Sequence, residues 1–172
     1  MSFIYGRVYF NLETLLQSHH LVDEPDEETL AGLQADPTMI ETVRQLLHRC
    51  YDVNILAFVR DSSFVFPVRK WVKAVIPDMW EYTGLPEKHI LAIPKTSDKL
   101  DYISYPRRPD VYIEHDPKEA VEWRKIGTPV LLRYDNNTDI HWNGYMIDTC
   151  SMGEYIANTI RGILHVEELQ YT

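Results

Sequence analysis

Short apolar runs that stop at polar residues recur along this chain, and they constrain its fold more than any other feature. The clearest is Val53–Val59, which is almost entirely apolar, as expected for a central parallel strand covered on both faces. Amphipathic stretches at helical spacing lie between the runs. We predict strands at Val8–Phe10, Val53–Val59, His89–Ile93, Val111–Ile113 and Pro129–Leu132. This alternation predicts a doubly wound α/β fold, a three-layer sandwich around a mostly parallel sheet of five or more strands.

The helices between these strands have recognisable starts. Pro37 is well placed as the first residue of a helix that extends to about Tyr51, because proline has no N–H to lose at that position. Further helices are predicted at Phe64–Ile76, Lys99–Ser104, Lys118–Arg124 and Ser151–Leu164. The polar cluster Asp135–Asp139 is predicted to be a turn.

The length of 172 residues suits one domain with a single core, so we expect residues 1–172 to form one unit. Residues 17–36 contain the acidic run Asp23–Glu28 and are predicted to be a short acidic insertion with at most one short helix. His19 and His20 in this segment lack a third ligand, so we expect them at the surface and not at a metal ion.

Charge and cysteine content limit the partners and the compartment. The chain has 17 Lys and Arg against 26 Asp and Glu, a net charge of -9. Nucleic acid is therefore an unfavourable partner, since that affinity comes mainly from basic side chains. Cys50 and Cys150 are too few for a disulfide framework and are expected to be free thiols. No apolar stretch approaches the length of a membrane span and no signal organisation is seen, so we expect a cytoplasmic protein without a membrane partner.

Polar side chains at the strand ends are the candidate site residues. Asn11 and Glu13 follow the first strand and would point to the same side at its carboxyl end, where open α/β sheets bind their ligands. The alternative is a capped turn, in which both side chains only satisfy loop backbone. Ser62 follows the second strand, in a loop that is either an anion-binding loop or a turn. Glu114 and Asp116 follow the fourth strand.

These strand ends resemble the motifs of the haloacid dehalogenase-like (HAD) phosphatase superfamily, over nearly the whole chain. Asn11-Leu12-Glu13-Thr14-Leu15 resembles the first motif, an apolar strand followed by D-x-D-x-T. Glu114-His115-Asp116-Pro117 resembles the fourth motif of paired acids. Lys99 suits the lysine of the third motif, with Lys95 as the alternative, and Ser62 or Ser63 would serve as the hydroxyl of the second. A weaker similarity is to the 5'-deoxynucleotidase branch, and the short segment between the first two motifs implies a domain without a cap.

The resemblance assigns roles to these positions. In the family the first aspartate attacks phosphorus, the second is a general acid and base, the lysine balances charge and the fourth-motif acid helps to hold magnesium. Asn11, Glu13, Lys99 and Ser62 thus stand at catalytic positions. The magnesium ligands implied by the resemblance are Asn11, Glu114 and Asp116.

Several of these positions depart from the family pattern. Asn11 has no anionic oxygen with which to form an acyl phosphate. Glu13 could still transfer protons, but its extra methylene displaces the carboxyl group. Leu15 replaces a threonine, and His115 replaces an acid although imidazole suits Mg²⁺ poorly.

These departures predict a catalytically degenerate HAD fold. We expect a binding or regulatory protein, with a protein or a phosphorylated small molecule as its partner. Family members without a cap usually leave the site open to large substrates or close it by oligomerising, so a homo-oligomer is one expected arrangement. The alternative is a weak magnesium-dependent phosphohydrolase, acting for example on nucleotides, in which Glu13 activates a water molecule.

Overall fold

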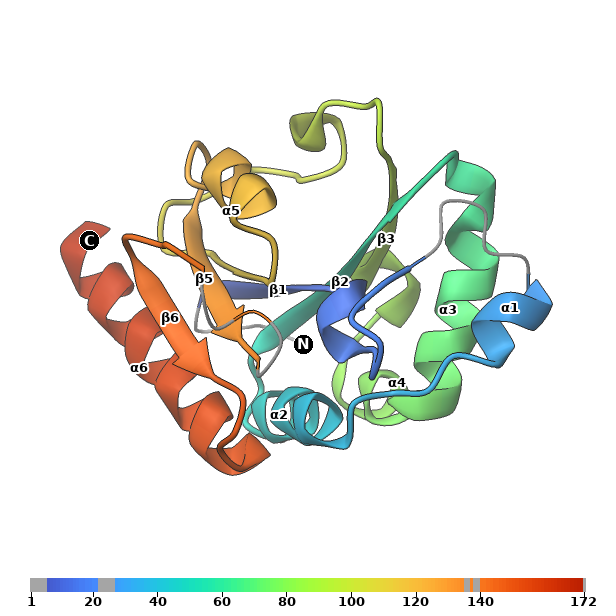
Figure 1. The fold of residues 1–172 in the computed structure, drawn as a ribbon, viewed down its shortest axis with the longest axis horizontal. Coiled ribbons are helices and arrows are strands. Elements are labelled where there is room, and N and C mark those ends of the chain that lie inside the picture. The colour runs from blue at the N-terminus through green and yellow to red at the C-terminus, as the bar shows by residue number, and fades with distance from the viewer. Residues whose placement is uncertain (1–5, 22–26, 135–136, 138–139, 172) are drawn as a thin grey trace.

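A parallel sheet of six strands forms the centre of the protein, in the order β3-β2-β1-β4-β5-β6. The computed structural model describes residues 6–21, 27–134, 137 and 140–171, and within them every strand pairing is parallel. The strands are β1 (Arg7–Asn11), β2 (Asp52–Val59), β3 (Ile90–Pro94), β4 (Val111–Glu114), β5 (Thr128–Arg133) and β6 (Tyr145–Asp148). The predicted fold class is confirmed, and the sheet has one strand, β6, beyond the five predicted (Figure 1).

Helices cover both faces of the sheet, as Figure 1 shows for α5 on one side and α2 and α6 on the other. The α-helices are α1 (Glu27–Ala31), α2 (Pro37–His48), α3 (Val65–Val75), α4 (Asp78–Tyr82), α5 (Pro117–Trp123) and α6 (Gly153–Tyr171). Short 3-10 turns occur at η1 (Leu12–Leu15), η2 (Ser62–Phe64), η3 (Pro86–His89) and η4 (Lys99–Asp101).

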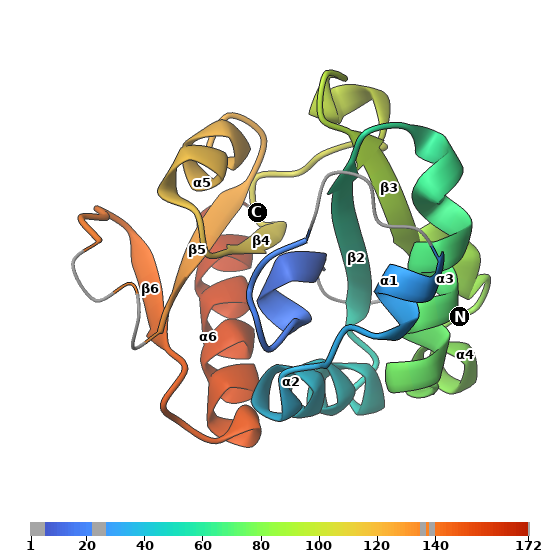
Figure 2. The ribbon, with the colours of Figure 1, turned by 45° about the vertical axis from the view of Figure 1, so that its right-hand side comes forward.

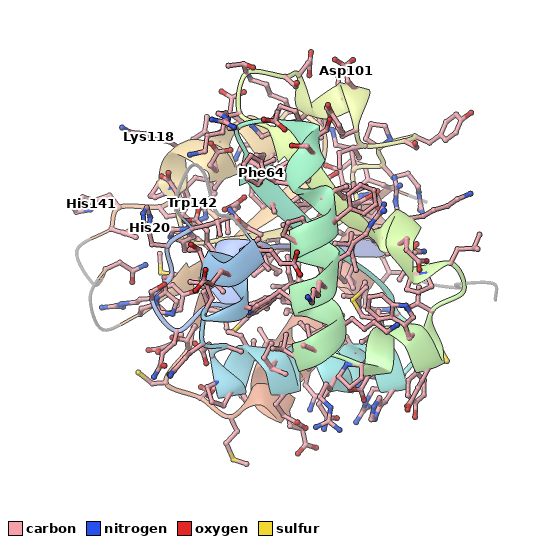
Figure 3. The ribbon with its side chains drawn as sticks, turned by 90° about the vertical axis from the view of Figure 1, so that its right-hand side faces the viewer. His20, Phe64, Asp101, Lys118, His141 and Trp142 are labelled. Carbon is pink, nitrogen blue, oxygen red and sulfur yellow. The ribbon has the colours of Figure 1, made fainter. Side chains whose placement is uncertain are left out.

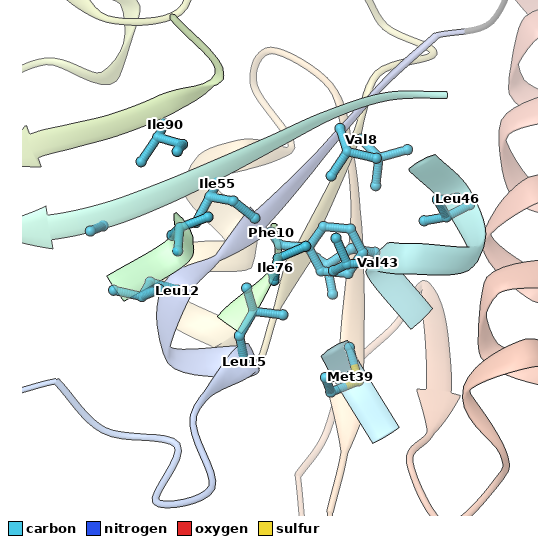
Figure 4. Packing of buried hydrophobic residues seen from close by; sticks show 14 of the residues in the cluster. Val8, Phe10, Leu12, Leu15, Met39, Val43, Leu46, Ile55, Ile76 and Ile90 are labelled. Atoms are coloured by element: carbon cyan, nitrogen blue, oxygen red, sulfur yellow. The ribbon is translucent and has the colours of Figure 1, made fainter. Parts of the chain in front are cut away.

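Alternate residues of each central strand enter two separate hydrophobic cores. Val8 and Phe10 of β1 face the larger core, which they share with Met39 and Val43 of α2 (Figure 4). Tyr9, between them, faces the smaller core on the side of α5. The period of two along the strand therefore divides its side chains between the two outer layers, as a sheet covered on both faces requires.

Predicted helices differ from the observed ones mainly at their ends. Pro37 does begin α2, and the Asp36 carboxylate caps it by accepting hydrogen bonds from the N–H groups of Thr38 and Met39. The helix ends at His48, before the predicted Tyr51. The predicted helix Lys99–Ser104 is wrong, because only the 3-10 turn η4 forms there. The last helix extends to Tyr171, beyond the predicted Leu164.

Other sequence predictions concern segments of irregular structure. Within residues 17–36 the structure contains the short helix α1, and most of the acidic run, Asp23–Asp26, lies outside the described residues. Of the predicted turn Asp135–Asp139, only Asn137 is described. Cys50 and Cys150 are exposed free thiols. Within the described ranges, none of the helices combines the length and the apolar character needed to cross a membrane.

Two glycines in α6 have opposite surroundings. A Cβ added at Gly153 would lie 2.8 Å from the carbonyl oxygen of Thr38 and 2.9 Å from Cβ of Glu41. Gly153 thus allows α6 to approach α2 closely. A Cβ added at Gly162 would meet no atom of the described residues within 4 Å.

Alanine substitutions should therefore have opposite effects at these two positions. We expect Gly162→Ala to raise the free energy of unfolding by about 0.5–1 kcal/mol, because alanine loses less backbone entropy in a helix. Gly153→Ala should lower it by about 1–3 kcal/mol, since the methyl group would collide with α2. Urea denaturation of both variants measures these differences, and equal effects at the two positions would contradict this account of α6.

Candidate functional site at the carboxyl end of the sheet

A cleft of about 260 Å³ lies at the carboxyl ends of the central strands. This is the edge at which ligands bind in open α/β sheets. Figure 3 shows the labelled side chains of Phe64, Asp101 and Lys118 toward this end of the molecule, on segments that follow β2, β3 and β4. The cleft is lined by Asn11, Glu13, Phe58, Pro94, Lys95, Ser97, Lys99, Asp116 and Glu119.

Asn11 lies buried at the end of β1, and both polar atoms of its side chain are engaged. Its Oδ1 accepts a hydrogen bond of 3.0 Å from the N–H of Glu13, which caps the turn η1. Its Nδ2 donates a hydrogen bond of 2.9 Å to Oε2 of Glu114, on the neighbouring strand β4. The expected proximity of Asn11 and Glu114 is observed, and Asn11 does more than cap a turn, because its Nδ2 bonds to a side chain and not to loop backbone.

Glu114 is fully buried, and protein donors occupy both of its oxygens. Trp123 Nε1 donates a hydrogen bond of 2.7 Å to Oε1, while Asn11 donates to Oε2. Burial raises the pKa of Glu114 to about 7, although the two hydrogen bonds favour the charged form and oppose this shift. The indole of Trp123 stacks on Tyr112 with ring centroids 4.3 Å apart, which holds its N–H toward the carboxylate.

Glu13 lies at the side of the cleft, next to His115. Nε2 of His115 is 3.6 Å from Glu13 Oε1, and the N–H of Leu21 donates a 2.8 Å hydrogen bond to Oε2. Burial pushes the pKa of Glu13 upward, but the interactions with His115 and Leu21 outweigh it and bring the pKa below its ordinary value. Burial lowers the pKa of His115, and its attraction to Glu13 more than reverses this, so the net shift is upward. The two side chains thus favour a charged pair.

Lys99 enters the cleft from η4 and is already paired. Its Nζ lies 3.1 Å from Oε2 of Glu119 on α5. The same Nζ lies 5.3 Å and 5.2 Å from the ring centroids of Phe58 and Trp123, within the range of cation–π attraction. Lys95, the alternative to Lys99, also lines the cleft.

The remaining predicted residues divide into one inside the cleft and one outside it. Asp116 lines the cleft, where its Oδ1 accepts a 2.9 Å hydrogen bond from the N–H of Lys118 and caps α5. Ser62 is exposed in η2 and is not among the residues that line the cleft. The structure therefore brings together Asn11, Glu13, Lys99, Glu114 and Asp116, and leaves Ser62 apart.

A magnesium ion, which phosphatases of the HAD type generally use, fits the observed donors poorly. Mg²⁺ requires oxygen ligands in a near-octahedral arrangement. Both oxygens of Glu114 already accept hydrogen bonds, and Asn11 directs its NH₂ group, a donor, at Glu114. Within the described ranges, no group of three or more His, Cys, Asp or Glu side chains is placed to hold a metal ion.

Sequence reasoning missed Phe58, Glu119 and Trp123. Glu119 and Trp123 are in α5, which begins directly after the β4 strand end. A helix that starts at the edge of the sheet places its first turn beside the strand end, so Glu119 could have been found. The contact of Trp123 with Glu114 depends on how α5 packs, and no local sequence pattern signals it.

Comparison with known proteins gives a structural likeness only. No protein-family model matches the chain. No curated protein matches it either. Among solved structures, it is similar to D,D-heptose 1,7-bisphosphate phosphatase from Burkholderia thailandensis, with a TM-score of 0.59 and 11% sequence identity over 91% of this chain and 98% of that chain. The fold is HAD-like. At this level of identity the likeness extends to the fold, and the HAD-like scaffold by itself assigns no activity.

The buried hydrogen bond between Trp123 and Glu114 should make the stability of a Trp123 variant depend on pH. The pKa of Glu114 is raised from 4.5 to about 7 in the folded state, so the protonated carboxyl group favours folding. This contribution to the free energy of unfolding is present at low pH and is lost as the pH rises through 7. Trp123→Phe removes a donor to the charged form. We expect this variant to lose about 1–2 kcal/mol more stability at pH 8 than at pH 5.5, relative to the wild type.

Tyr112→Phe is the matched control, measured by urea denaturation at the same two pH values. The Tyr112 hydroxyl is buried and has no hydrogen-bond partner among the described residues, so its removal should have the same effect at both pH values. A Trp123→Phe cost that did not change with pH would show that Trp123 contributes packing alone.

Proposed function

We propose that this chain is a binding or regulatory protein on a HAD-like fold, and that its strand-end cleft has no phosphatase turnover. One observation carries this proposal. The amide of Asn11 stands where the resemblance places the nucleophile, and its two polar atoms are held by Glu13 N–H and Glu114. An amide in this position has neither the charge nor the freedom to attack phosphorus. We also propose that the domain has no cap and that the protein is cytoplasmic.

The other positions of the cleft support this conclusion. Lys99 is paired with Glu119, so part of its charge is neutralised before any phosphate arrives. Glu13 is the strongest argument for residual hydrolysis, because it lines the cleft and its lowered pKa keeps it ionised at neutral pH. A lowered pKa also makes it a weak base, since general-base catalysis is most effective when the pKa lies near the working pH. A weak magnesium-dependent phosphohydrolase is therefore the second candidate.

The charges of the cleft favour a protein over a free phosphate compound as its partner. Three acids, Glu13, Asp116 and Glu119, face two lysines, Lys95 and Lys99. Even with the charged imidazole of His115 beside Glu13, an added phosphate dianion would meet no net positive charge. Elsewhere, α6 exposes large apolar side chains, and the tyrosines among them are of a kind enriched in protein interfaces. They are Tyr155, Val166, Leu169 and Tyr171.

The wild-type protein should not hydrolyse an aryl phosphate. We expect the rate with p-nitrophenyl phosphate and Mg²⁺ to equal that of Glu13→Gln, because neither protein has a nucleophile at position 11. Colorimetric turnover measured side by side provides the test. Robust wild-type activity that Glu13→Gln abolishes would establish the second candidate and remove the first.

Restoring an acid at position 11 should not restore a phosphatase. In Asn11→Asp two carboxylates would face each other at the distance of the present 2.9 Å hydrogen bond. This should raise the pKa of one of them and lower the melting temperature at pH 8. Activity should stay below detection, alone or combined with His115→Asp.

Aryl-phosphate turnover and the Mg²⁺ dependence of the melting temperature report on these variants. The isosteric Glu114→Gln change in the Asn11→Asp background removes the repulsion and should recover part of the lost melting temperature. Turnover from Asn11→Asp alone would mean that the rest of the phosphatase site is intact, contrary to the proposal.

A further inference from the structure

A larger groove, of about 670 Å³, lies at the opposite end of the sheet. Tyr51 in this groove directly precedes β2, whereas Phe58 near the end of β2 lines the strand-end cleft. The length of the strand separates the two by roughly 20 Å. The groove lies between the middle of α6 and the chain that follows α2. Figure 2 shows α2 and α6 side by side. Its size is typical of small-molecule sites.

Basic side chains dominate this groove, although the protein as a whole is acidic. Arg49, Arg161 and His165 line it, and among the described residues the single acid in the lining is Glu168. The carboxylate of Glu168 accepts hydrogen bonds of 3.0 Å and 3.2 Å from Nη2 of Arg107, so its charge is already balanced. The groove therefore has a local positive charge within a chain of net charge -9.

The two arginines differ in how they are held. Arg161 Nε donates a 3.1 Å hydrogen bond to the hydroxyl of Tyr51, and its Nη1 donates a 3.0 Å bond to Oδ1 of Asn158. Its guanidinium also lies 5.8 Å from the centroid of the Tyr51 ring. These contacts fix its position and use two of its five N–H groups. The exposed side chain of Arg49 has no hydrogen-bond or ion-pair partner among the described residues.

Gly162 also lines this groove, and the packing of the fold does not explain why a glycine stands at this position of α6. A glycine inside a helix is unfavourable compared with alanine. A Cβ at this position would meet nothing within 4 Å in the part of the chain that the structure describes, so no element there requires a glycine. Its missing side chain leaves the wall of the groove open beside Arg161.

We propose that this groove binds a small molecule that carries a phosphate group. Guanidinium groups bind phosphate oxygens through paired, charge-assisted hydrogen bonds, and here one is held in place while the other is free to close on the ligand. The open backbone at Gly162 admits the ligand between them. This site is separate from the strand-end cleft and does not depend on the function proposed for that cleft.

Titration calorimetry of the full chain with inorganic pyrophosphate tests the proposal. We expect saturable binding that weakens as salt is added. Arg49→Gln should weaken it about tenfold, because a charge-assisted bond is lost. Arg133→Gln is the matched control, since it removes an exposed charge on β5 that does not line the groove, and it should leave the affinity within about twofold.

A second pair of variants separates ligand binding from folding. Gly162→Glu adds a carboxylate where there is open space, so it should abolish binding while the melting temperature stays at or above that of the wild type. Gly162→Ala should retain binding. No measurable affinity at about 10 mM pyrophosphate would overturn the proposal, because even a weak site would be detected at that concentration. Binding that Arg49→Gln and Gly162→Glu leave unchanged would overturn it too, since the ligand would then occupy another site.

Discussion

The buried hydrogen bond between Asn11 and Glu114 is the contact on which the rest of the strand-end site depends. It joins β1 to β4 at the edge where a parallel sheet binds ligands. A fully buried carboxylate is costly unless donors surround it, and here Asn11 and Trp123 supply one donor to each oxygen. An aspartate at position 11 would offer a second acceptor instead of a donor. The amide of Asn11 therefore supplies one of the two donors that this buried carboxylate needs.

The arrangement of the sheet and the meeting of Asn11 with Glu114 were predictable from the sequence. Apolar runs such as Val53–Val59 are long enough to identify a covered strand, and parallel strands bring their carboxyl ends to one edge whatever the loops between them do. For the same reason, Lys99 reached the cleft although the helix predicted around it does not form. A strand end places a residue within a few ångströms of the site, and the local conformation then matters less.

What could not be predicted depends on packing or on weak local patterns. Trp123 reaches Glu114 through the packing of α5 on the sheet, in which its ring stacks against Tyr112, and its neighbours in sequence do not reveal this contact. The edge strand β6 alternates half-buried and exposed residues around one buried Ile147, so it lacks the apolar run of a central strand. Ser62 has the right residue type after β2, but η2 keeps it exposed and away from the cleft.

The stack of Tyr9, Tyr112 and Trp123 beneath the cleft has a further consequence. The rings are nearly parallel, with centroids 4.7 Å and then 4.3 Å apart, and the Lys99 ammonium lies 5.2 Å from the last of them. Indole emission responds to nearby charge and to stacked neighbours. Any molecule that draws Lys99 away from Trp123 will change the electric field at that ring. Trp123 is thus an intrinsic fluorophore in contact with a residue that lines the cleft, and a change in its emission would report a displacement of Lys99.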